Sequence, residues 1–515
     1  MKHHHCVASV LIVLLGLGGV ASAQVDTAWV RTWYGPHNAV WGRLVATDDS
    51  GNVFAAGALA APGGDSIDYA VAKYGPNGTE KWTTRYTGPG MGDDQVWDLC
   101  VDRSGNCIVT GESRGSGTED DYATVKYLPG GDTAWVRRYD GPVNRDDEGL
   151  AVASDDSGNV YVTGWSIGDG TASDVATIKY DAAGTEQWVA RWNGTIFIDR
   201  GQDVCADSDH NVYVVGQAGA GFLTYDLLVI KLTSDGDTAW VRTLNGPGNG
   251  WDQFDRVGVD GSGNVYACGF ATMADTTQDA VVAKYTSTGD TAWVRYLDGP
   301  DSRGDWARDM VVDLQGECWV CGWSETADSS YDWLVARIDP AGNVAWQRSW
   351  DRGQSDNAWA LASGDSGYLY VTGSSDVAPW LSDVATIKYD AMTGAQLWVS
   401  LYDGPDQGSD APMDIAVGPD GLPVVAGATT DSTGTGMLVM KYTRTPGVEE
   451  GQPAVVPERR LPTVMSIPQL ARVRGRLLDA LGREVTDRKQ GVSPGVYFLC
   501  PDDAAGQARK VVVQR

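Results

Sequence analysis

The chain has 515 residues and a formal net charge of −29, from 39 basic and 68 acidic side chains. Nucleic acid and anionic membranes repel so acidic a chain, which excludes both as partners. The 65 glycines, 21 tryptophans and 21 tyrosines favour many short strands joined by tight turns. Because no long stretch shows helical periodicity, the composition predicts an all-β protein.

Residues 1–23 have the layout of a cleavable signal peptide. Lys2 and three histidines precede an apolar run that ends in three small residues, the last of them Ala23. The run is shorter than the ~20 apolar residues of a membrane-spanning helix. We therefore expect cleavage after Ala23, no transmembrane segment in the mature protein, and a secreted, extracellular or cell-surface location reached through the periplasm.

A tryptophan recurs with a period of 52 or 53 residues through most of the chain. The repeat tryptophans are Trp29, Trp82, Trp135, Trp188, Trp240, Trp293, Trp346 and Trp398. A glycine at the end of a short strand pattern recurs in the same register, at Gly57, Gly111, Gly164, Gly216, Gly269, Gly322, Gly373 and Gly427. Eight copies of each marker indicate eight repeats, and we expect the indoles to pack between neighbouring repeats.

Each repeat contains four short strands, as the third repeat illustrates. Residues 149–154 and 160–163 flank a tight turn, and residues 175–180 and 188–192 form a second pair. The turn begins with Asp and ends with Gly-Asn, which suits a type I turn followed by a glycine of positive φ. Four strands in about 50 residues, with an aromatic at a fixed position, are typical of a propeller blade. The sequence therefore predicts an eight-bladed β-propeller, with four antiparallel strands per blade, over residues 24–443.

The two ends of the repeat array are incomplete. Seven of the eight repeat tryptophans follow a glycine by four residues, but Trp29 follows Val25, since no third strand precedes it. The mature chain thus begins with a lone fourth strand, residues 29–34, and the last repeat stops after its third strand at Tyr442. We expect the N-terminal strand to complete the last blade and close the ring, because an open ring would expose sheet edges.

The repeated segments Gly158–Gly164 (GNVYVTG) and Asp174–Tyr180 (DVATIKY) resemble the β-propeller repeats of large secreted bacterial proteins. This resemblance covers residues 25–443 and implies an architecture rather than an activity. The Gly-x-x-x-Trp spacing also resembles the docking motif of quinoprotein dehydrogenase propellers, which likewise have eight blades. The second resemblance implies a quinone-dependent oxidoreductase as an alternative function.

A Pro-containing linker, residues 444–461, is expected to follow the propeller. Three strand-like segments then occur at residues 474–485, 493–499 and 509–515. In sequence and order they resemble the C-terminal sorting domain of type IX secretion cargo, although the usual Asn-Pro opening is missing. The resemblance implies a small β-sandwich-like domain over residues 462–515 that is recognised by the secretion machinery and attaches the protein to the cell surface or is cleaved there.

Two series of aspartates recur in register with the glycine marker. The first precedes the first strand of seven repeats, at Asp94, Asp147, Asp199, Asp252, Asp305, Asp356 and Asp410. The second precedes the third strand, at Asp68, Asp121, Asp174, Asp226, Asp279, Asp332 and Asp383. Because neighbouring strands alternate in direction, both series should lie at the same end of the blades.

Both series are interpreted as turn caps that accept backbone N–H groups. The alternative is that the first series binds a hard cation such as Ca²⁺ weakly, or that the acidic face attracts a basic partner. The hairpin aspartates Asp48, Asp102, Asp155 and Asp260 lack the bidentate acid of a calcium loop and are interpreted as turn residues. We expect no other cofactor.

Six further tryptophans lie near the start of a first strand or directly after the glycine marker. They are Trp41, Trp97, Trp165, Trp306, Trp323 and Trp359. These positions place them at the same end of the blades as the aspartates. Stacking on sugars and partial burial in loops are both open interpretations of them.

Cysteine signals are weak. Cys318 and Cys321 are spaced like half of a redox or zinc site, but they share a predicted strand, in which residues three apart face opposite sides. Cys100 and Cys107 flank a predicted hairpin turn, so a disulfide between them is left open. We therefore expect buried thiols or a structural disulfide rather than metal binding.

Signals for catalysis are weak as well. The mature chain has two histidines, His37 and His210, and lacks metalloprotease and nucleophile-elbow motifs. We therefore predict no catalytic residues and a secreted propeller that binds or displays an extracellular ligand, either a glycan or a protein. Two enzymes stay open as alternatives: the quinone-dependent oxidoreductase, and a polysaccharide-active enzyme that uses carboxylates of the acidic end.

Overall fold

The computed structural model describes residues 27–35, 37, 39–61, 66–364, 367–378 and 381–443, together with four short strands nearer the C-terminus. The predicted signal peptide (1–23) and linker (444–461) lie outside the described residues. The chain divides into two compact units, Met1–Thr445 and Pro446–Arg515. Within the described residues, no helix has the length and apolar character needed to cross a membrane.

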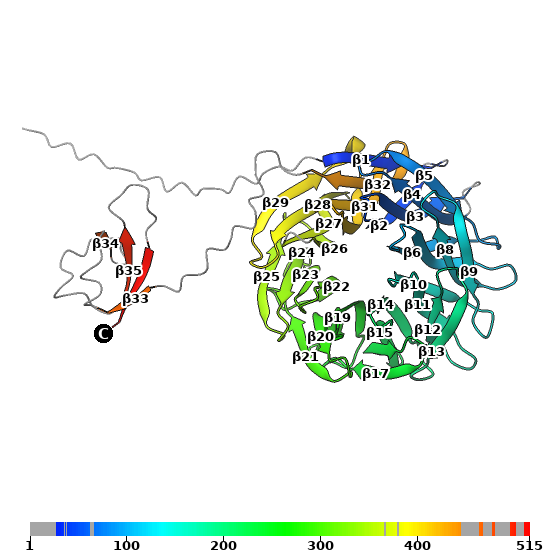
Figure 1. Ribbon diagram of the computed structural model, residues 1–515, viewed down its shortest axis with the longest axis horizontal. Helices are drawn as coiled ribbons and strands as arrows, with labels where there is room; N and C mark the ends of the chain where they lie inside the picture. Colours follow the sequence, from blue (N-terminus) through cyan, green and yellow to red (C-terminus); the bar gives the residue numbers. More distant parts are fainter. Residues whose placement is uncertain are drawn as a thin grey trace, which may run out of the picture. The chain divides into compact units, whose positions relative to one another are not determined.

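The first unit is a ring of eight four-stranded sheets, which confirms the predicted eight-bladed propeller (Figure 1). In every blade the strands are antiparallel and are named A to D from the centre of the ring outwards. Strand A of each blade, such as β2 (Val40–Thr47) or β6 (Asp94–Val101), therefore lies at the centre of the ring, where residues of different blades come closest.

The first four blades follow one another along the chain. Blade 1 continues after β2 with β3 (Val53–Ala60), β4 (Ile67–Tyr74) and β5 (Glu80–Tyr86). Blade 2 continues after β6 with β7 (Cys107–Arg114), β8 (Asp120–Tyr127) and β9 (Thr133–Tyr139). Blade 3 contains β10 (Asp147–Ser154), β11 (Val160–Ile167), β12 (Ser173–Tyr180) and β13 (Glu186–Trp192). Blade 4 contains β14 (Arg200–Ala206), β15 (Val212–Gly221), β16 (Thr224–Leu232) and β17 (Thr238–Leu244).

The other four blades have the same order. Blade 5 contains β18 (Gln253–Val259), β19 (Val265–Thr272), β20 (Gln278–Tyr285) and β21 (Thr291–Leu297). Blade 6 contains β22 (Asp305–Val312), β23 (Cys318–Glu325), β24 (Tyr331–Ile338) and β25 (Val344–Trp350). Blade 7 contains β26 (Asp356–Gly364), β27 (Tyr368–Ala378), β28 (Leu381–Asp390) and β29 (Gln396–Tyr402). Blade 8 contains β30 (Asp410–Val417), β31 (Pro423–Asp431) and β32 (Gly434–Tyr442), after the short 3-10 helix η1 (Pro405–Gln407).

The N-terminal strand closes the ring, as the incomplete repeats predict. Strand β1 (Thr27–Trp33) pairs antiparallel with β32 as the outermost strand of blade 8, with Trp29 opposite Lys441 and Trp33 opposite Met437. Residues about 400 positions apart in sequence thus share one sheet, and blade 8 has no unpaired outer edge on β32.

The turns between strands A and B have the predicted geometry. In blade 3, Asp155 Oδ1 accepts the backbone N–H groups of Ser157 and Asn159, each at 2.9 Å, and Gly158 has a φ of 79°. The same two contacts recur at Asp48, Asp102 and Asp260. The hairpin aspartates are therefore turn residues.

The core is divided among the blade interfaces. The buried apolar side chains of the described residues form eight clusters, and each cluster combines side chains from two neighbouring blades. The cluster between blades 8 and 1 includes Trp29 from β1 and Val53 from β3. Each blade is therefore stabilised mainly by burial against its two neighbours.

The repeat tryptophans of the D strands connect neighbouring blades. Seven of the eight donate their indole N–H to a carbonyl in the C–D turn of the next blade, as Trp346 does to Ala391 O at 3.2 Å. A Cβ added to Gly394, in the same turn, would lie 2.5 Å from the Trp346 ring. The glycine of each Gly-x-x-x-Trp motif therefore recurs because it contacts the repeat tryptophan of the preceding blade.

The described strands of the second unit form one sheet, in the order β33 (Thr463–Ser466), β36 (Arg509–Gln514), β35 (Gly495–Cys500) and β34 (Arg476–Leu478). Strands β35 and β36 overlap the predicted segments 493–499 and 509–515, whereas β34 covers only three residues of the segment 474–485 and β33 was not predicted. Strand β33 pairs parallel with β36, and the other neighbours are antiparallel. The β-sandwich and its sorting role stay predictions.

Candidate functional site

An irregularity in every A strand shapes the centre of the ring. In blade 3 the register shifts between Gly149 and Ala151, so Leu150 is an extra residue opposite Gly164. A Cβ on Gly164 would lie 1.9 Å from the Glu148 carbonyl oxygen, so this position requires glycine. The recurring glycine therefore lies opposite a β-bulge of strand A. The prediction that strand B ends at this glycine is wrong, because β11 continues to Ile167.

The bulge places one extra side chain per blade at the centre of the ring. These bulge residues are Arg43, Trp97, Leu150, Gln202, Asp255, Arg308, Trp359 and Met413. All except Asp255 are at least partly exposed. Bulges re-aim side chains and are frequent beside functional sites, so this end of the ring is a candidate ligand-binding surface.

The residue after the bulge is aspartate in every second blade. These central aspartates are Asp98, Asp203, Asp309 and Asp414, in blades 2, 4, 6 and 8. Each accepts a backbone N–H from strand A of the next blade, at 2.7 or 2.8 Å. The sequence analysis missed them, although their alternation, 13 residues before the glycine marker, is visible in the sequence.

One arginine lies among the central aspartates. Arg256 Nε is 3.2 Å from Asp309 Oδ1, and the Arg256 side chain is 40% exposed. Burial disfavours the charged guanidinium, but the nearby carboxylates, Asp309 foremost, raise the pKa of Arg256. Burial also raises the pKa of Asp98 to about 6 and those of Asp203 and Asp414 to about 7. The four central aspartates therefore outnumber the one arginine that lies among them.

These raised pKa values predict a fold that is more stable in mild acid than in mild base. Because the pKa values of Asp98, Asp203 and Asp414 exceed the unfolded value of about 4, their protonated forms stabilise the fold at low pH. This stability is lost as the pH rises through 6 and 7. We expect the Tm to fall between about pH 4 and pH 7, and Asp203→Asn to reduce the fall. A Tm that rises over this interval would contradict the assignment.

The first predicted aspartate series lies beneath the surface at the start of the A strands. All seven side chains are 0–1% exposed. Each accepts a backbone N–H from the loop that precedes its strand. Asp252 accepts a second one, from Thr272 at 2.6 Å. These aspartates therefore do not form an exposed acidic surface, and their contacts are those of turn caps.

The second series lies beside the first, and several of its members pair with arginines. Ion pairs of 2.7 to 3.2 Å join Asp68 to Arg85, Asp121 to Arg138, Asp174 to Arg191, and Asp383 to Arg352. Carboxylate oxygens of Asp121, from the second series, and Asp147, from the first, lie within 4.8 Å of one another, which confirms that the two series share one end of the blades. Asp140 belongs to the same group of carboxylates, but Arg138 already neutralises Asp121.

The cap contacts predict little effect of calcium. Millimolar Ca²⁺ should change the Tm no more than an equal ionic strength of NaCl. Both oxygens of Asp252 already accept backbone N–H groups, and those of Asp305 accept one backbone N–H and the Ser324 hydroxyl. Thermal melts with Ca²⁺, Mg²⁺ and NaCl would measure this. A calcium-specific stabilisation that disappears in the double variant Asp252→Asn, Asp305→Asn would instead establish a cation site.

The predicted tryptophans of blades 6 and 7 form a row of aromatic rings. Ring centroids are 4.5 Å apart between Phe270 and Trp306, 5.5 Å between Trp306 and Trp323, and 5.2 Å between Trp323 and Trp359. Trp251 extends the row into blade 5, at 5.5 Å from Phe270. Trp306, Trp323 and Trp359 are partly exposed. The sequence analysis did not single out Trp251 or Phe270, which lie outside the positions it compared.

Charged side chains accompany the tryptophans of blades 2 and 3. The Arg43 guanidinium lies 4.6 Å from the centroid of the Trp97 ring. Trp165 donates its indole N–H to Glu148 Oε2 at 2.8 Å. Burial, reinforced by the Glu148 carboxylate, raises the pKa of Glu112 to about 8. The same end of the ring thus has an aromatic sector in blades 5 to 7 and a mixed charged and aromatic sector in blades 1 to 3.

Trp41, in blade 1, is the most exposed of the six predicted tryptophans, at 40%. It precedes the bulge of its strand, as Trp306 does in blade 6. Unlike Trp306, it lies outside the aromatic row described above.

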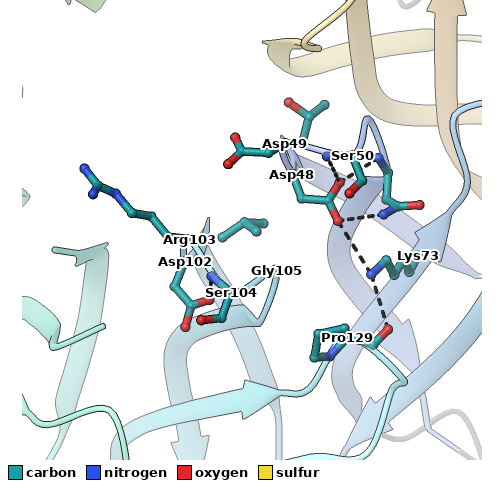
Figure 2. Close-up of a pocket in the computed structure, with 12 residues that line it drawn as sticks. Asp48, Asp49, Ser50, Lys73, Asp102, Arg103, Ser104, Gly105 and Pro129 are labelled. Carbon is teal, nitrogen blue, oxygen red and sulfur yellow. Dashed lines mark hydrogen bonds and ion pairs between the residues drawn. The ribbon is translucent and has the colours of Figure 1, made fainter. Parts of the chain in front are cut away.

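The opposite end of the blades carries the A–B turns and the hollows between them. Figure 2 shows the hollow of about 310 Å³ between the turns of blades 1 and 2. Asp48 Oδ1 accepts N–H groups from Ser50 and Asn52, and Lys73 Nζ lies 3.7 Å from its Oδ2 and donates to Pro129 O at 3.2 Å. The polar groups of this hollow are hydrogen-bonded within the turns and stabilise them, so the hollow is not the candidate functional site.

The histidines occupy peripheral positions. His37 is exposed, and His210 takes the place of a turn glycine with a φ of 61°. His210 Nδ1 lies 2.9 Å from Asp155 Oδ2, and that oxygen also accepts hydrogen bonds from Asn159 and Tyr161. The group of Asp155, Asp156 and His210 is therefore part of a turn contact between blades 3 and 4.

All six cysteines within the described propeller have free thiols. The disulfide between Cys100 and Cys107 is not formed, because the hairpin register places Cys107 opposite Val101 rather than opposite Cys100. Cys318 and Cys321 belong to different interface clusters, as expected for residues on opposite faces of one strand. Burial raises the pKa of the Cys321 thiol well above its ordinary value, which disfavours metal or redox chemistry there.

Comparison with known proteins supports the fold and nothing finer. No protein-family model and no curated protein sequence matches the chain. Among solved structures, Sqt1 from Chaetomium thermophilum is similar with a TM-score of 0.51 and 10% identity, over 82% of this chain and 100% of that one. A europium-containing methanol dehydrogenase has a TM-score of 0.48 and 12% identity, over 82% and 94% of the two chains. At 10% identity, the likeness to Sqt1 supports the propeller architecture alone.

Proposed function

We propose that this protein is a non-catalytic module that binds or displays an extracellular ligand at the end of the propeller where the A strands begin. The observation that carries the proposal is the aromatic row from Trp251 to Trp359 in blades 5 to 7, at the same end as the bulge residues. Its four tryptophans are at least partly exposed, and the buried Phe270 packs between Trp251 and Trp306. Partly exposed aromatics supply large contact areas at low entropic cost, as binding surfaces require.

The proposed location is outside the cell. The signal-type segment 1–23 and the resemblance of residues 462–515 to a type IX sorting domain support export and attachment at the surface. The strong negative charge favours glycans or proteins over nucleic acids as ligands.

A second candidate function is a polysaccharide-active enzyme, because one pair of carboxylates has unequal surroundings. Burial and the Glu148 charge raise the pKa of Glu112 to about 8. Burial also raises the pKa of Glu148, but the hydrogen bond from Trp165 opposes that shift. Glycosidases use such a pair as a protonated acid and an ionised base or nucleophile.

Arrays that carry both immobilised glycans and extracellular proteins test the proposal. We expect saturable binding of the purified protein to at least one of these ligands, with no decrease in the amount of ligand on prolonged incubation. Absence of binding to both classes, or time-dependent loss of the ligand, would overturn it.

A further inference from the structure

A groove of about 470 Å³ lies between blades 5 and 6, at the end of the propeller where the A strands begin. Three segments of blade 5 and two of blade 6 line it. The lining residues are Gly250, Trp251, Thr272, Thr276, Thr277, Gln278, Arg303, Gly304 and Glu325. One large aromatic ring is thus combined with hydroxyl, amide, guanidinium and carboxylate groups, and the other rings of the aromatic row continue from it.

Trp251 is exposed and yet held in place. It is 46% exposed, and its indole N–H donates to Gln217 Oε1 at 2.9 Å. Gln217 itself is 4% exposed. A β-bridge joins Trp251 to Tyr225, and the Phe270 ring meets the indole edge-on at 5.5 Å and 76°. The Trp251 ring therefore exposes apolar surface to solvent in a fixed orientation. Because the ring is already ordered, binding a ligand costs little conformational entropy.

The polar groups of the groove have hydrogen-bonding capacity left over. Arg303 Nη1 lies 3.2 Å from Glu325 Oε1, and the side chains are 42% and 28% exposed. Within the described residues, this is the one ion pair or hydrogen bond that either side chain makes. A guanidinium has five N–H donors and a carboxylate has about four acceptor sites, so most of both sets face the groove or solvent.

One residue of the groove has an unusual backbone. Thr276 has a φ of 75°, in a region that β-branched residues rarely adopt. In the A–B hairpins the corresponding turn position is a glycine, such as Gly51 with a φ of 74°. Residues held in such conformations cluster at ligand-binding sites, where the surrounding structure fixes them.

We infer that this groove binds a sugar unit of a neutral glycan, an inference that rests on the proposed binding function. A pyranose ring has one face of C–H groups, which matches the exposed indole of Trp251, and a rim of hydroxyls. Neighbouring hydroxyls both donate and accept hydrogen bonds, which matches the Arg303–Glu325 pair. An anionic ligand is disfavoured, since Asp275, Asp279 and Asp298 line the adjacent hollow on the other side of the Met273–Thr277 turn.

Native affinity electrophoresis in gels that contain mixed-linkage β-glucan, xyloglucan or galactomannan tests the inference. The intact protein should be retarded by at least one of these polysaccharides. Trp251→Ala should raise the dissociation constant for that polysaccharide by about tenfold or more, which is the usual effect of truncating an aromatic residue that dominates binding. Glu325→Gln, which keeps the shape of the side chain and removes its charge, should weaken binding severalfold. Leu314→Ala is the control, because it removes a side chain that is 73% exposed in the A–B turn of blade 6, at the opposite end of the propeller, and it should leave retardation unchanged.

The outcomes separate this inference from the proposed function. Retardation that survives both Trp251→Ala and Glu325→Gln overturns the groove assignment and leaves the binding function standing. Binding of a protein ligand on the arrays, with no retardation by any of the three polysaccharides, overturns the ligand class. A melting curve of each variant equal to that of the wild type shows that lost retardation comes from the site rather than from unfolding.

Discussion

A chain that lacks residues 27–33 is expected to lose the cooperative fold of the whole propeller. These residues form β1, which completes blade 8 and contributes Trp29, 8% exposed, to the cluster between blades 8 and 1. Trp29 Nε1 also donates to Pro76 O at 3.1 Å, and Arg31 Nε donates to Gly78 O at 2.7 Å. Removing β1 therefore opens a sheet edge on β32 and breaks one of the eight interfaces, a loss of more than about 5 kcal/mol, comparable to the stability of a whole domain.

Circular dichroism melts and size-exclusion chromatography measure this effect. The truncated chain should aggregate or melt without a sharp transition. A synthetic peptide of residues 24–36 should restore the transition in part, because it can occupy the vacant edge of β32. A truncated chain that is monomeric and melts at the wild-type temperature would show that β1 is not needed to close the ring.

Trp346→Ala should destabilise the propeller by ~3–5 kcal/mol, the usual cost of removing a large buried aromatic. Trp346 is 6% exposed, donates to Ala391 O at 3.2 Å and stacks on Tyr389 at 6.3 Å between the ring centroids. Trp240 occupies the same repeat position but is only partly buried, so Trp240→Ala should cost less.

Chemical denaturation of the two variants and of Trp41→Ala would test this order. The expected loss of unfolding free energy is largest for Trp346→Ala, intermediate for Trp240→Ala, and smallest for Trp41→Ala, whose side chain is 40% exposed in the wild type. Equal losses for Trp346→Ala and Trp41→Ala would show that the repeat tryptophans do not support the blade interfaces.

The sequence was sufficient to predict the propeller because the sequence pattern of one blade recurs eight times. Each blade packs against its neighbour in the same way. The contact between Gly394 and Trp346 therefore recurs between the corresponding glycines and tryptophans of other blades. Ring closure was also predictable, since the strand missing before Trp29 and the strand missing after Tyr442 are complementary. Both inferences need only periodicity and unpaired edges.

The site was less predictable, because it depends on departures from the repeat. The bulge beside Gly164 is not visible in hydrophobic periodicity, and it decides that Leu150 and its counterparts such as Trp359 reach the centre. Burial of the first aspartate series, including Asp252, could not be distinguished from exposure by spacing alone. Trp251 belongs to the loop that enters blade 5, and its fixed position comes from contacts with Tyr225 and Gln217 of blade 4.

Whether this end of the propeller binds or catalyses is the central question, and Glu112 makes it experimentally accessible. If Glu112 and Glu148 formed a hydrolytic pair, Glu112→Gln would abolish turnover while leaving binding intact, because the amide cannot act as an acid. A non-catalytic module would show no turnover to abolish, in the wild type or in the variant. A quinone-dependent oxidoreductase would be revealed separately, by the absorbance of a bound quinone in the purified protein.

The most direct measurement is the chemical state of a ligand after it has been bound. A glycan or protein ligand captured by the propeller, incubated to equilibrium and released with denaturant, would be analysed by mass spectrometry and for new reducing ends. We predict that the ligand is recovered at its original mass and amount. Shortened or oxidised ligand, formed by the wild type and absent after incubation with Glu112→Gln, would contradict a non-catalytic role.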